Sequence, residues 1–216
     1  MYKVEDKDEL WHIIRECYTT GNFTKLENLD ISNLSSLTYA FGLYYYLDSL
    51  NLNLSKWDVS NVKSMCYVFD GCENLTELDI SKWNVSNVKY MYGLFNICHK
   101  LQELNISNWN VSNVKDMHDL FYKCYSLKNL VIFKWNVSNV KNMRFMFAYC
   151  QNLEKLDLSK WNVSNVKEMC GMFEGCRKLR ILNILNWNIT KVENKDGIFN
   201  NCFKLNIIDC LLFTLD

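Results

Sequence analysis

Apolar and polar positions along this chain follow a pattern that returns every 26 residues. Residues 83–108 give the type unit, and the pattern is W-N-V-S-N-V-K-x-M-x-x-L/M/V-F-x-x-C-x-x-L-x-x-L-x-I/L-S-x. A fixed period of this length indicates stacked supersecondary units, which we call coils, because one unit cannot bury its apolar face alone. Each coil begins with one of six tryptophans: Trp57, Trp83, Trp109, Trp135, Trp161 and Trp187.

One stretch of each coil has the L-x-x-L-x-L spacing of a leucine-rich repeat, as at residues 101–106. Alternation there directs Leu104 and Ile106 inward and Glu103 and Asn105 outward. The stretch therefore predicts a short parallel strand on one face, with neighbouring coils about 4.8 Å apart.

A second stretch of each coil carries apolar residues at steps of three and four. This spacing predicts a short extended piece that runs into a helical or 3₁₀ turn on the opposite side. In the type unit the residues concerned are Val85, Val88, Met91 and Phe95.

The first 25 residues predict a helix that covers the start of the stack. Residues 6–9 resemble a capping box, apolar residues follow at i, i+3, i+4 and i+7 from Leu10, and Gly21 is placed to end a helix. An uncovered end would expose unpaired strand groups and core side chains. We assign Trp11 to this cap and not to the tryptophan column.

The chain thus reads as one continuous domain with atypical ends. The first repeat lacks its tryptophan and is about three residues short. The apolar C-terminal edge, with Phe213 and Leu215, is either a surface for contact with a second copy or a last strand tucked against the stack. The expected parts are a helical cap at 1–25, an atypical repeat at 26–56, six repeats at 57–212 and an edge at 213–216.

The repeat resembles that of the BspA-like leucine-rich-repeat family of bacterial surface proteins. The resemblance rests on the run W-D/N-V-S-N-V-K-x-M-x-x-x-F-x-x-C-x-x-L-x-x-L-x-I-S and covers roughly residues 57–210. It implies a right-handed solenoid with strands on one face and turns or 3₁₀ pieces on the back. It also implies display on bacteria, a role in adhesion or partner binding, and no catalytic residue.

Composition narrows the choice of partner. Lysine and arginine number 24, as do aspartate and glutamate, so the neutral chain does not favour nucleic acid. The N-terminus is charged where a signal peptide needs an apolar run, and no apolar stretch approaches the roughly 18 residues that span a membrane. The resemblance suggests the cell surface, whereas the absent signal and the reduced-type cysteines fit the cytoplasm, so both locations stay open.

Cysteine, asparagine and histidine positions argue for packing and against a metal, a cofactor or an active site. A column of thiols spreads along a line, whereas a metal site brings four ligands to one point, usually with C-x-x-C spacing, which is absent. Cys66 and Cys170 lie off the column, where we expect greater accessibility. His12, His99 and His118 are scattered, and the latter two are expected on solvated turns. The cysteine column consists of Cys72, Cys98, Cys124, Cys150, Cys176 and Cys202.

Two exposed surfaces are candidates for partner binding. The first is a lysine column, which is either a solvated face or an anion-binding stripe: Lys63, Lys89, Lys115, Lys141 and Lys167. The second is the outward strand face of the central coils, where variation within a regular array, or simple repeat drift, introduces apolar residues. Its candidate residues are Glu103, Asn105, Asn129, Val131, Phe133, Lys155, Asp157, Ile181 and Leu185.

The leading hypothesis is a non-enzymatic scaffold or adhesin that binds a protein or a glycan through its strand face. A self-assembling array that uses the C-terminal edge or the strand face is the alternative. A thiol or metal-binding protein is the second alternative. The tryptophans are expected in the core, and a partly exposed aromatic strip that grips carbohydrate is the other interpretation.

Overall fold

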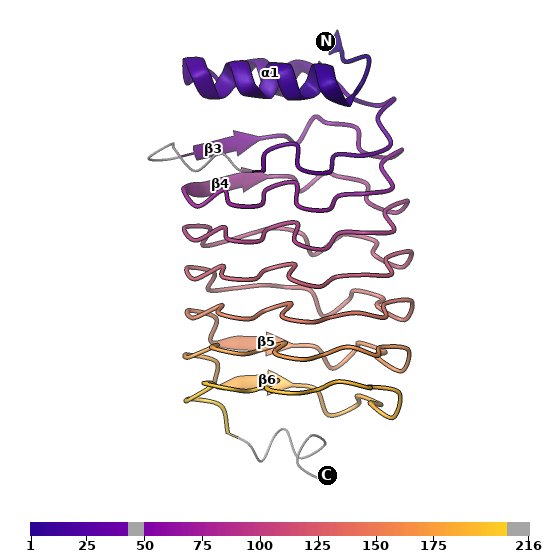
Figure 1. Ribbon diagram of the computed structural model, residues 1–216, viewed down its shortest axis with the longest axis vertical. Helices are drawn as coiled ribbons and strands as arrows, with labels where there is room; N and C mark the ends of the chain where they lie inside the picture. The colour runs from indigo at the N-terminus through magenta and orange to yellow at the C-terminus, as the bar shows by residue number, and fades with distance from the viewer. Residues whose placement is uncertain (43–49, 207–216) are drawn as a thin grey trace.

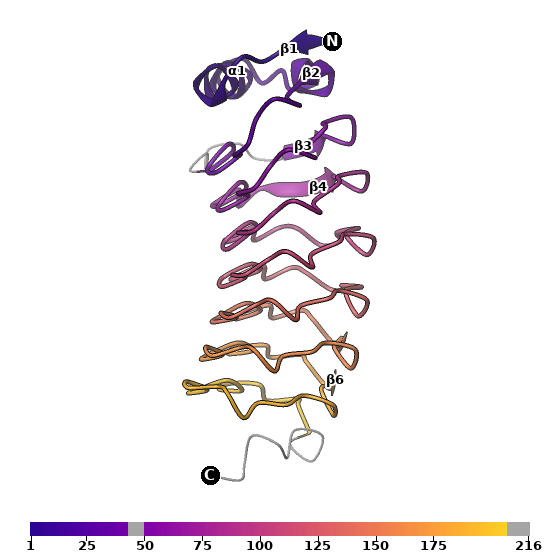
Figure 2. The ribbon, with the colours of Figure 1, turned by 90° about the vertical axis from the view of Figure 1, so that its right-hand side faces the viewer.

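The computed structural model describes residues 1–42 and 50–206, which form a stack of coils with a helix across its N-terminal end (Figure 1). The coil that contains β6 (Ile181–Asn183) lies toward the opposite end of the stack (Figure 2). No helix among the described residues is long and apolar enough to cross a bilayer. In chain order the elements are β1 (Tyr2–Lys3), α1 (Lys7–Thr20), η1 (Thr24–Asn28), β2 (Leu29–Asp30), β3 (Leu50–Asn53), β4 (Leu75–Asp79), β5 (Lys155–Asp157) and β6 (Ile181–Asn183).

The expected N-terminal helix is α1, and its caps follow from the sequence. The side chain of Asp6 accepts the backbone N–H of Glu9 at 2.9 Å, and Gly21 ends the helix with φ +71°. Leu10, Ile14 and Cys17 are buried, whereas Trp11 is 43% exposed and takes no part in the tryptophan column. The helix thus covers the first coil with one apolar face.

Short parallel strands form one face of the stack, as predicted. They pair as β1 with β2, β3 with β4 and β5 with β6. In the coils between β4 and β5 the strand shortens to a single bridge between Glu103 and Asn129. The partners Lys155 and Ile181 are 26 residues apart, so each coil places equivalent residues side by side.

A second ladder of parallel bridges runs along the stack after each tryptophan segment. Lys89 N donates to Lys63 O at 2.8 Å, and the same bond recurs from coil to coil. The bridged residues are Ser36, Ser64, Tyr90, Asp116, Asn142, Glu168 and Asn194. This ladder is the extended piece that the apolar spacing predicts.

The back of each coil is a series of turns, as the pattern predicts, and among the described residues these turns do not extend into 3₁₀ helices. Gly93 and Ile97 have φ near +60°, and these left-handed residues interrupt each run of i to i+3 bonds before a helix can form. The backbone bonds between coils instead. Gly93 N donates to His118 O at 2.9 Å, and Ile97 N donates to Tyr122 O at 2.8 Å.

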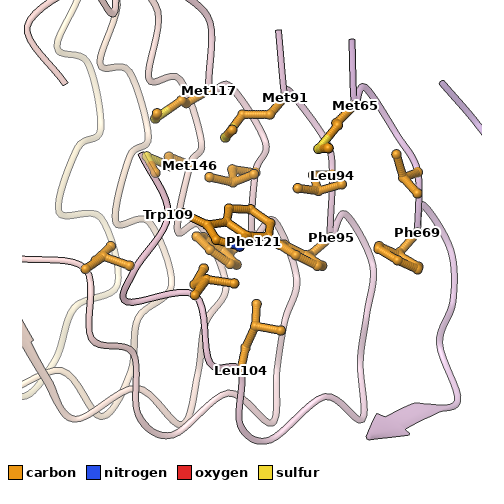
Figure 3. Packing of buried hydrophobic residues seen from close by; sticks show 14 of the residues in the cluster. Met65, Phe69, Met91, Leu94, Phe95, Leu104, Trp109, Met117, Phe121 and Met146 are labelled. Atoms are coloured by element: carbon orange, nitrogen blue, oxygen red, sulfur yellow. The ribbon is translucent and has the colours of Figure 1, made fainter. Parts of the chain in front are cut away.

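The core consists of columns of identical side chains. Successive tryptophan rings are nearly parallel with centroids 6.3 to 6.5 Å apart, and none of the six is more than 4% exposed. The interpretation of the tryptophans as a partly exposed aromatic strip is therefore wrong. Figure 3 shows Trp109 beside Phe121 and Phe95, with the methionine column above them. At five of the six tryptophans the indole N–H donates to a carbonyl of the preceding coil, as from Trp83 to Leu54 at 2.9 Å.

The first coil is longer than the others, which corrects the expectation of a short repeat. Ser36 pairs with Ser64 across 28 residues, whereas Ser64 pairs with Tyr90 across 26. The apolar residues Ile31, Leu34 and Leu37 are buried, as the pattern required. The ladder nevertheless continues through this longer coil.

Candidate partner-binding face and lysine column

The structure places eight of the nine predicted strand-face residues on the surface. They alternate along each strand with buried leucines such as Leu130 and Leu156, so the pleat turns them outward. The ninth, Phe133, is less exposed than expected: it is half-buried, and the Lys134 ammonium lies 5.6 Å from its ring centroid. The exposed eight are Glu103, Asn105, Asn129, Val131, Lys155, Asp157, Ile181 and Leu185.

Apolar side chains gather on two coils of this face. Val131 is 55% exposed, Ile181 is 47% exposed and Leu185 is 71% exposed. The coil between them is polar there, because Lys155 and Asp157 occupy the outward positions of β5. The outward strand face therefore carries two apolar islands separated by one charged strand.

An acidic hollow lies on the same face beside β3 and β4, and sequence reasoning missed it. Its carboxylates come from Glu27, Glu77, Asp79 and Glu103, and no lysine or arginine lines it. Hydrogen bonds from the hydroxyl and N–H of Ser81 lower the pKa of Asp79. Glu27 belongs to η1, outside the regular repeats, so no repeat position signals its presence. The outward strand face thus changes from acidic near β4 to apolar near β6.

The cysteine column packs in the core. The Cys124 thiol donates to Phe95 O at 3.1 Å and is fully buried. Equivalent bonds are made in every coil, and burial raises the pKa of Cys72 to about 12. A thiol with so high a pKa is protonated at neutral pH and is a poor nucleophile. Within the described part of the chain no group of histidine, cysteine and carboxylate side chains could hold a metal ion.

The expectation for the two off-column thiols is only half right. Cys170 is half-buried, but Cys66 is 1% exposed. Burial raises the pKa of Cys66, although Ser64 donates a hydrogen bond to its sulfur at 3.2 Å. The error arises because its burial depends on side chains of the adjacent coils, which the repeat pattern does not specify.

Two of the histidines are more enclosed than expected. His118 stacks on Tyr92 at 4.6 Å and contacts Asp116 at 2.7 Å, and His99 stacks on Tyr125 at 4.5 Å. His118 extends a row of rings along the back that sequence reasoning missed, since the row passes from one repeat position, at Tyr67, to its neighbour, at Tyr92. The rest of the row is Tyr39, Tyr67 and Tyr92.

All five side chains of the lysine column are exposed. Lys167 pairs with Glu193 at 2.6 Å, and this contact raises the pKa of Lys167. Asp116, which lies next to Lys115 in sequence, instead contacts His118. The lysine column therefore presents like charges one coil apart, whose mutual repulsion in water is weak and screened by salt.

Comparison with known proteins identifies a family. The profile of the family described as "Mycoplasma protein of unknown function, DUF285" matches residues 12–131 and 91–208. Among solved structures, a leucine-rich-repeat protein of T. pallidum (TpLRR) is similar at 20% identity and a TM-score of 0.39, over 69% of this chain and 73% of that chain. The curated proteins contain no match. Because the two profile matches together cover most of the repeat array, this chain belongs to the DUF285 family.

Proposed function

We propose that this chain is a non-enzymatic interaction scaffold that binds a protein or glycan partner through its outward strand face. In this proposal the stack is a right-handed solenoid of the leucine-rich-repeat type, and the BspA-like character of the repeat supports an adhesin-type role at a bacterial surface. The observation that carries the proposal is the exposure of Val131, Ile181 and Leu185 on a regular sheet face whose inward leucines are buried.

The exposed apolar area is large enough to matter for binding. Apolar surface contributes about 25 cal/mol per Å² when it is covered, or about 1 kcal/mol for a side chain that is roughly half exposed. Covering Val131, Ile181 and Leu185 would then contribute about 3 kcal/mol, which corresponds to about a hundredfold in affinity. Interface energy concentrates in a few well-packed side chains near the centre of a contact, and the surrounding residues exclude water.

The test compares two double variants that add the same charge. Val131→Lys with Phe133→Lys places two ammonium groups in the first apolar island. The control, Thr19→Lys with Thr20→Lys, adds two lysines to the exposed last turn of α1, outside both the outward strand face and the lysine column. Retention of surface proteins and glycans from the native organism is measured for each immobilised variant.

The two variants should differ. We expect partners retained by the unmodified chain to be lost with Val131→Lys and Phe133→Lys and kept with the control, while both variants melt cooperatively. Equal retention by the two variants would show that the contact lies elsewhere.

Self-assembly is the second candidate function. In the last described coil Ile189, Val192 and Phe199 are half-buried, whereas their equivalents in earlier coils are fully buried. The predicted edge residues Phe213 and Leu215 lie outside the described residues. Light scattering across a concentration series tests this candidate. A mass that grows with concentration, and no longer does so in Phe213→Lys or Leu215→Lys, supports self-assembly. A constant monomer mass rules it out.

A further inference from the structure

Lysine recurs at the same position of five successive coils, and within the described part of the chain no side-chain bond shared along the column accounts for this choice of residue. Two other exposed columns are equally constant, and each has such a bond. Asn84 accepts the N–H of Ser86 at 3.1 Å, and Asn87 donates to the carbonyl of Ser60 in the preceding coil at 2.7 Å. These bonds recur in the neighbouring coils and account for the asparagines.

The lysine side chains are held in line but not neutralised. Their backbones are tied by the ladder, with N to O distances of 2.8 to 2.9 Å from each lysine to the one before it. Within residues 1–42 and 50–206 only the last lysine of the column forms an ion pair, with Glu193. The other four ammonium groups are Lys63, Lys89, Lys115 and Lys141, and all are exposed.

The surrounding segments concentrate positive charge further. We define the lysine strip as the five segments K/N-W-D/N-V-S-N-V-K at 56–63, 82–89, 108–115, 134–141 and 160–167. They contain nine lysines and one acidic residue, Asp58, for a net charge of 9 − 1 = +8 in a chain whose total is zero. The remainder of the molecule carries the balancing net charge of −8, and its carboxylates Asp79 and Asp157 lie near Lys82 and Lys160.

We propose that the lysine strip binds a linear anionic polysaccharide, sulfated or carboxylated, laid along the axis of the stack. Coils about 4.8 Å apart place the five column lysines over about 19 Å, a length suited to a short oligosaccharide. Lysine is a point charge on a flexible stem, so a line of lysines follows a chain of anionic groups without requiring one fixed geometry. Exposed asparagines between the two lysine positions supply amide groups for sugar hydroxyls.

Other polyanions fit the strip less well. Single-stranded nucleic acid is usually held by bases that stack on exposed aromatic rings. Here the tryptophans of the strip are buried, and the ring next to it in sequence, that of Tyr90, is 42% exposed. One ring offers no row of stacking platforms. Membrane surfaces are bound by helices or segments that also insert apolar side chains, and the valines of the strip are buried.

The probe is a heparin-derived octasaccharide titrated calorimetrically into the full chain at several salt concentrations. The test variant carries Lys89→Gln, Lys115→Gln and Lys141→Gln. The control carries Lys3→Gln, Lys178→Gln and Lys204→Gln, which remove the same charge from exposed positions outside both proposed binding surfaces. We expect the test variant to weaken binding about tenfold or more and to reduce the salt dependence, and the control to change affinity less than about threefold.

A gain of function gives an independent readout. Asn108→Lys with Asn186→Lys fills the gap in the strip at residue 108, so the octasaccharide should bind more tightly to this variant. Absent binding by the unmodified chain, or equal losses in the two triple variants, would overturn the proposal. Equal affinity for a single-stranded oligonucleotide or for anionic vesicles would overturn the choice of polysaccharide. The outward strand face is unchanged in the test variant, so failure here leaves the proposed function intact.

Discussion

Gly93 is required because of a ring on the neighbouring coil, and replacing it with alanine tests the packing of the back. Its φ is +61°, and a Cβ built there would lie 2.1 Å from a ring carbon of Tyr67. The same pairing recurs where Phe145 covers Gly171 and Tyr149 covers Gly175. The left-handed conformation alone does not require glycine, since Asp119 occupies the equivalent position with φ +55°.

The expected cost has two parts. A non-glycine residue in the left-handed region costs about 1 to 2 kcal/mol. The Tyr67 ring must also move, although it stacks on Tyr39 at 4.9 Å and meets Tyr92 edge-on at 5.3 Å. Each such aromatic contact is worth about 0.5 to 1.5 kcal/mol, so Gly93→Ala should destabilise the fold by about 2 to 5 kcal/mol.

Gly21→Ala is the matched control. Gly21 has φ +71° with nothing within 4 Å of the added Cβ, so this variant carries the conformational cost without the ring. Thermal and urea unfolding should place Gly93→Ala about 1 to 3 kcal/mol below Gly21→Ala, a difference of several degrees in Tm. In a Tyr67→Ala background the additional cost of Gly93→Ala should fall to that of the control. If the cost is the same with and without Tyr67, the ring contact is not the reason for the glycine.

Three further results are expected. With a thiol reagent at neutral pH, at most three of the ten cysteines should react before unfolding: half-buried Cys170 and Cys202, and Cys210, which lies outside the described residues. Asn113→Ala should cost about 1 kcal/mol in unfolding experiments because its amide donates to Ser86 O at 2.7 Å, whereas Asn108→Ala on the exposed corner should be nearly neutral. Burial raises the pKa of Asp119, so its contribution to stability is present below about pH 4 and is lost as pH rises through the folded pKa; Asp119→Asn should therefore raise Tm at pH 7 and leave it unchanged near pH 3.

The inward columns and the helical cap could be predicted from sequence because they depend on local periodicity. Leu104 and Ile106 are buried and Asn105 is exposed, as alternation required. Asp6 and Gly21 begin and end α1 through groups within one helical turn. The exposed candidates on the strand face follow from the same alternation.

Features that depend on contacts between different repeat positions could not be predicted in this way. Cys66 is buried, although the equivalent residues of the other coils are polar or half-exposed. Residue 93 is glycine because the Tyr67 ring of the preceding coil fills the space that a side chain would need. Glu27, in η1, lines the acidic hollow from outside the six regular repeats. In the first two cases the burial or the identity of the residue depends on a neighbouring side chain at a position that varies between repeats.

Removal of one coil separates the two proposed binding surfaces. A partner that follows the stack along its axis needs the same side chain on every coil, as the lysine column offers, whereas a partner that docks at one place needs a particular order of coils. Deleting residues 135–160 keeps the 26-residue register and joins Lys134 to Trp161, the junction found between neighbouring repeats. The octasaccharide then loses Lys141 and Lys160 and should bind only a few times more weakly.

The same deletion removes Lys155 and Asp157 and brings the coil of Val131 next to that of Ile181, with Val131 beside Asn183 and Phe133 beside Leu185. A strand-face partner that recognises the present spacing of the two apolar islands should therefore be lost. Binding of both ligands is measured on the same purified chain, with circular dichroism to confirm the shortened stack. A parallel loss of both ligands would mean that one partner spans the two surfaces. Unchanged binding of the strand-face partner would place its contact outside the central coils, because the deletion removes one whole coil from the middle of that face.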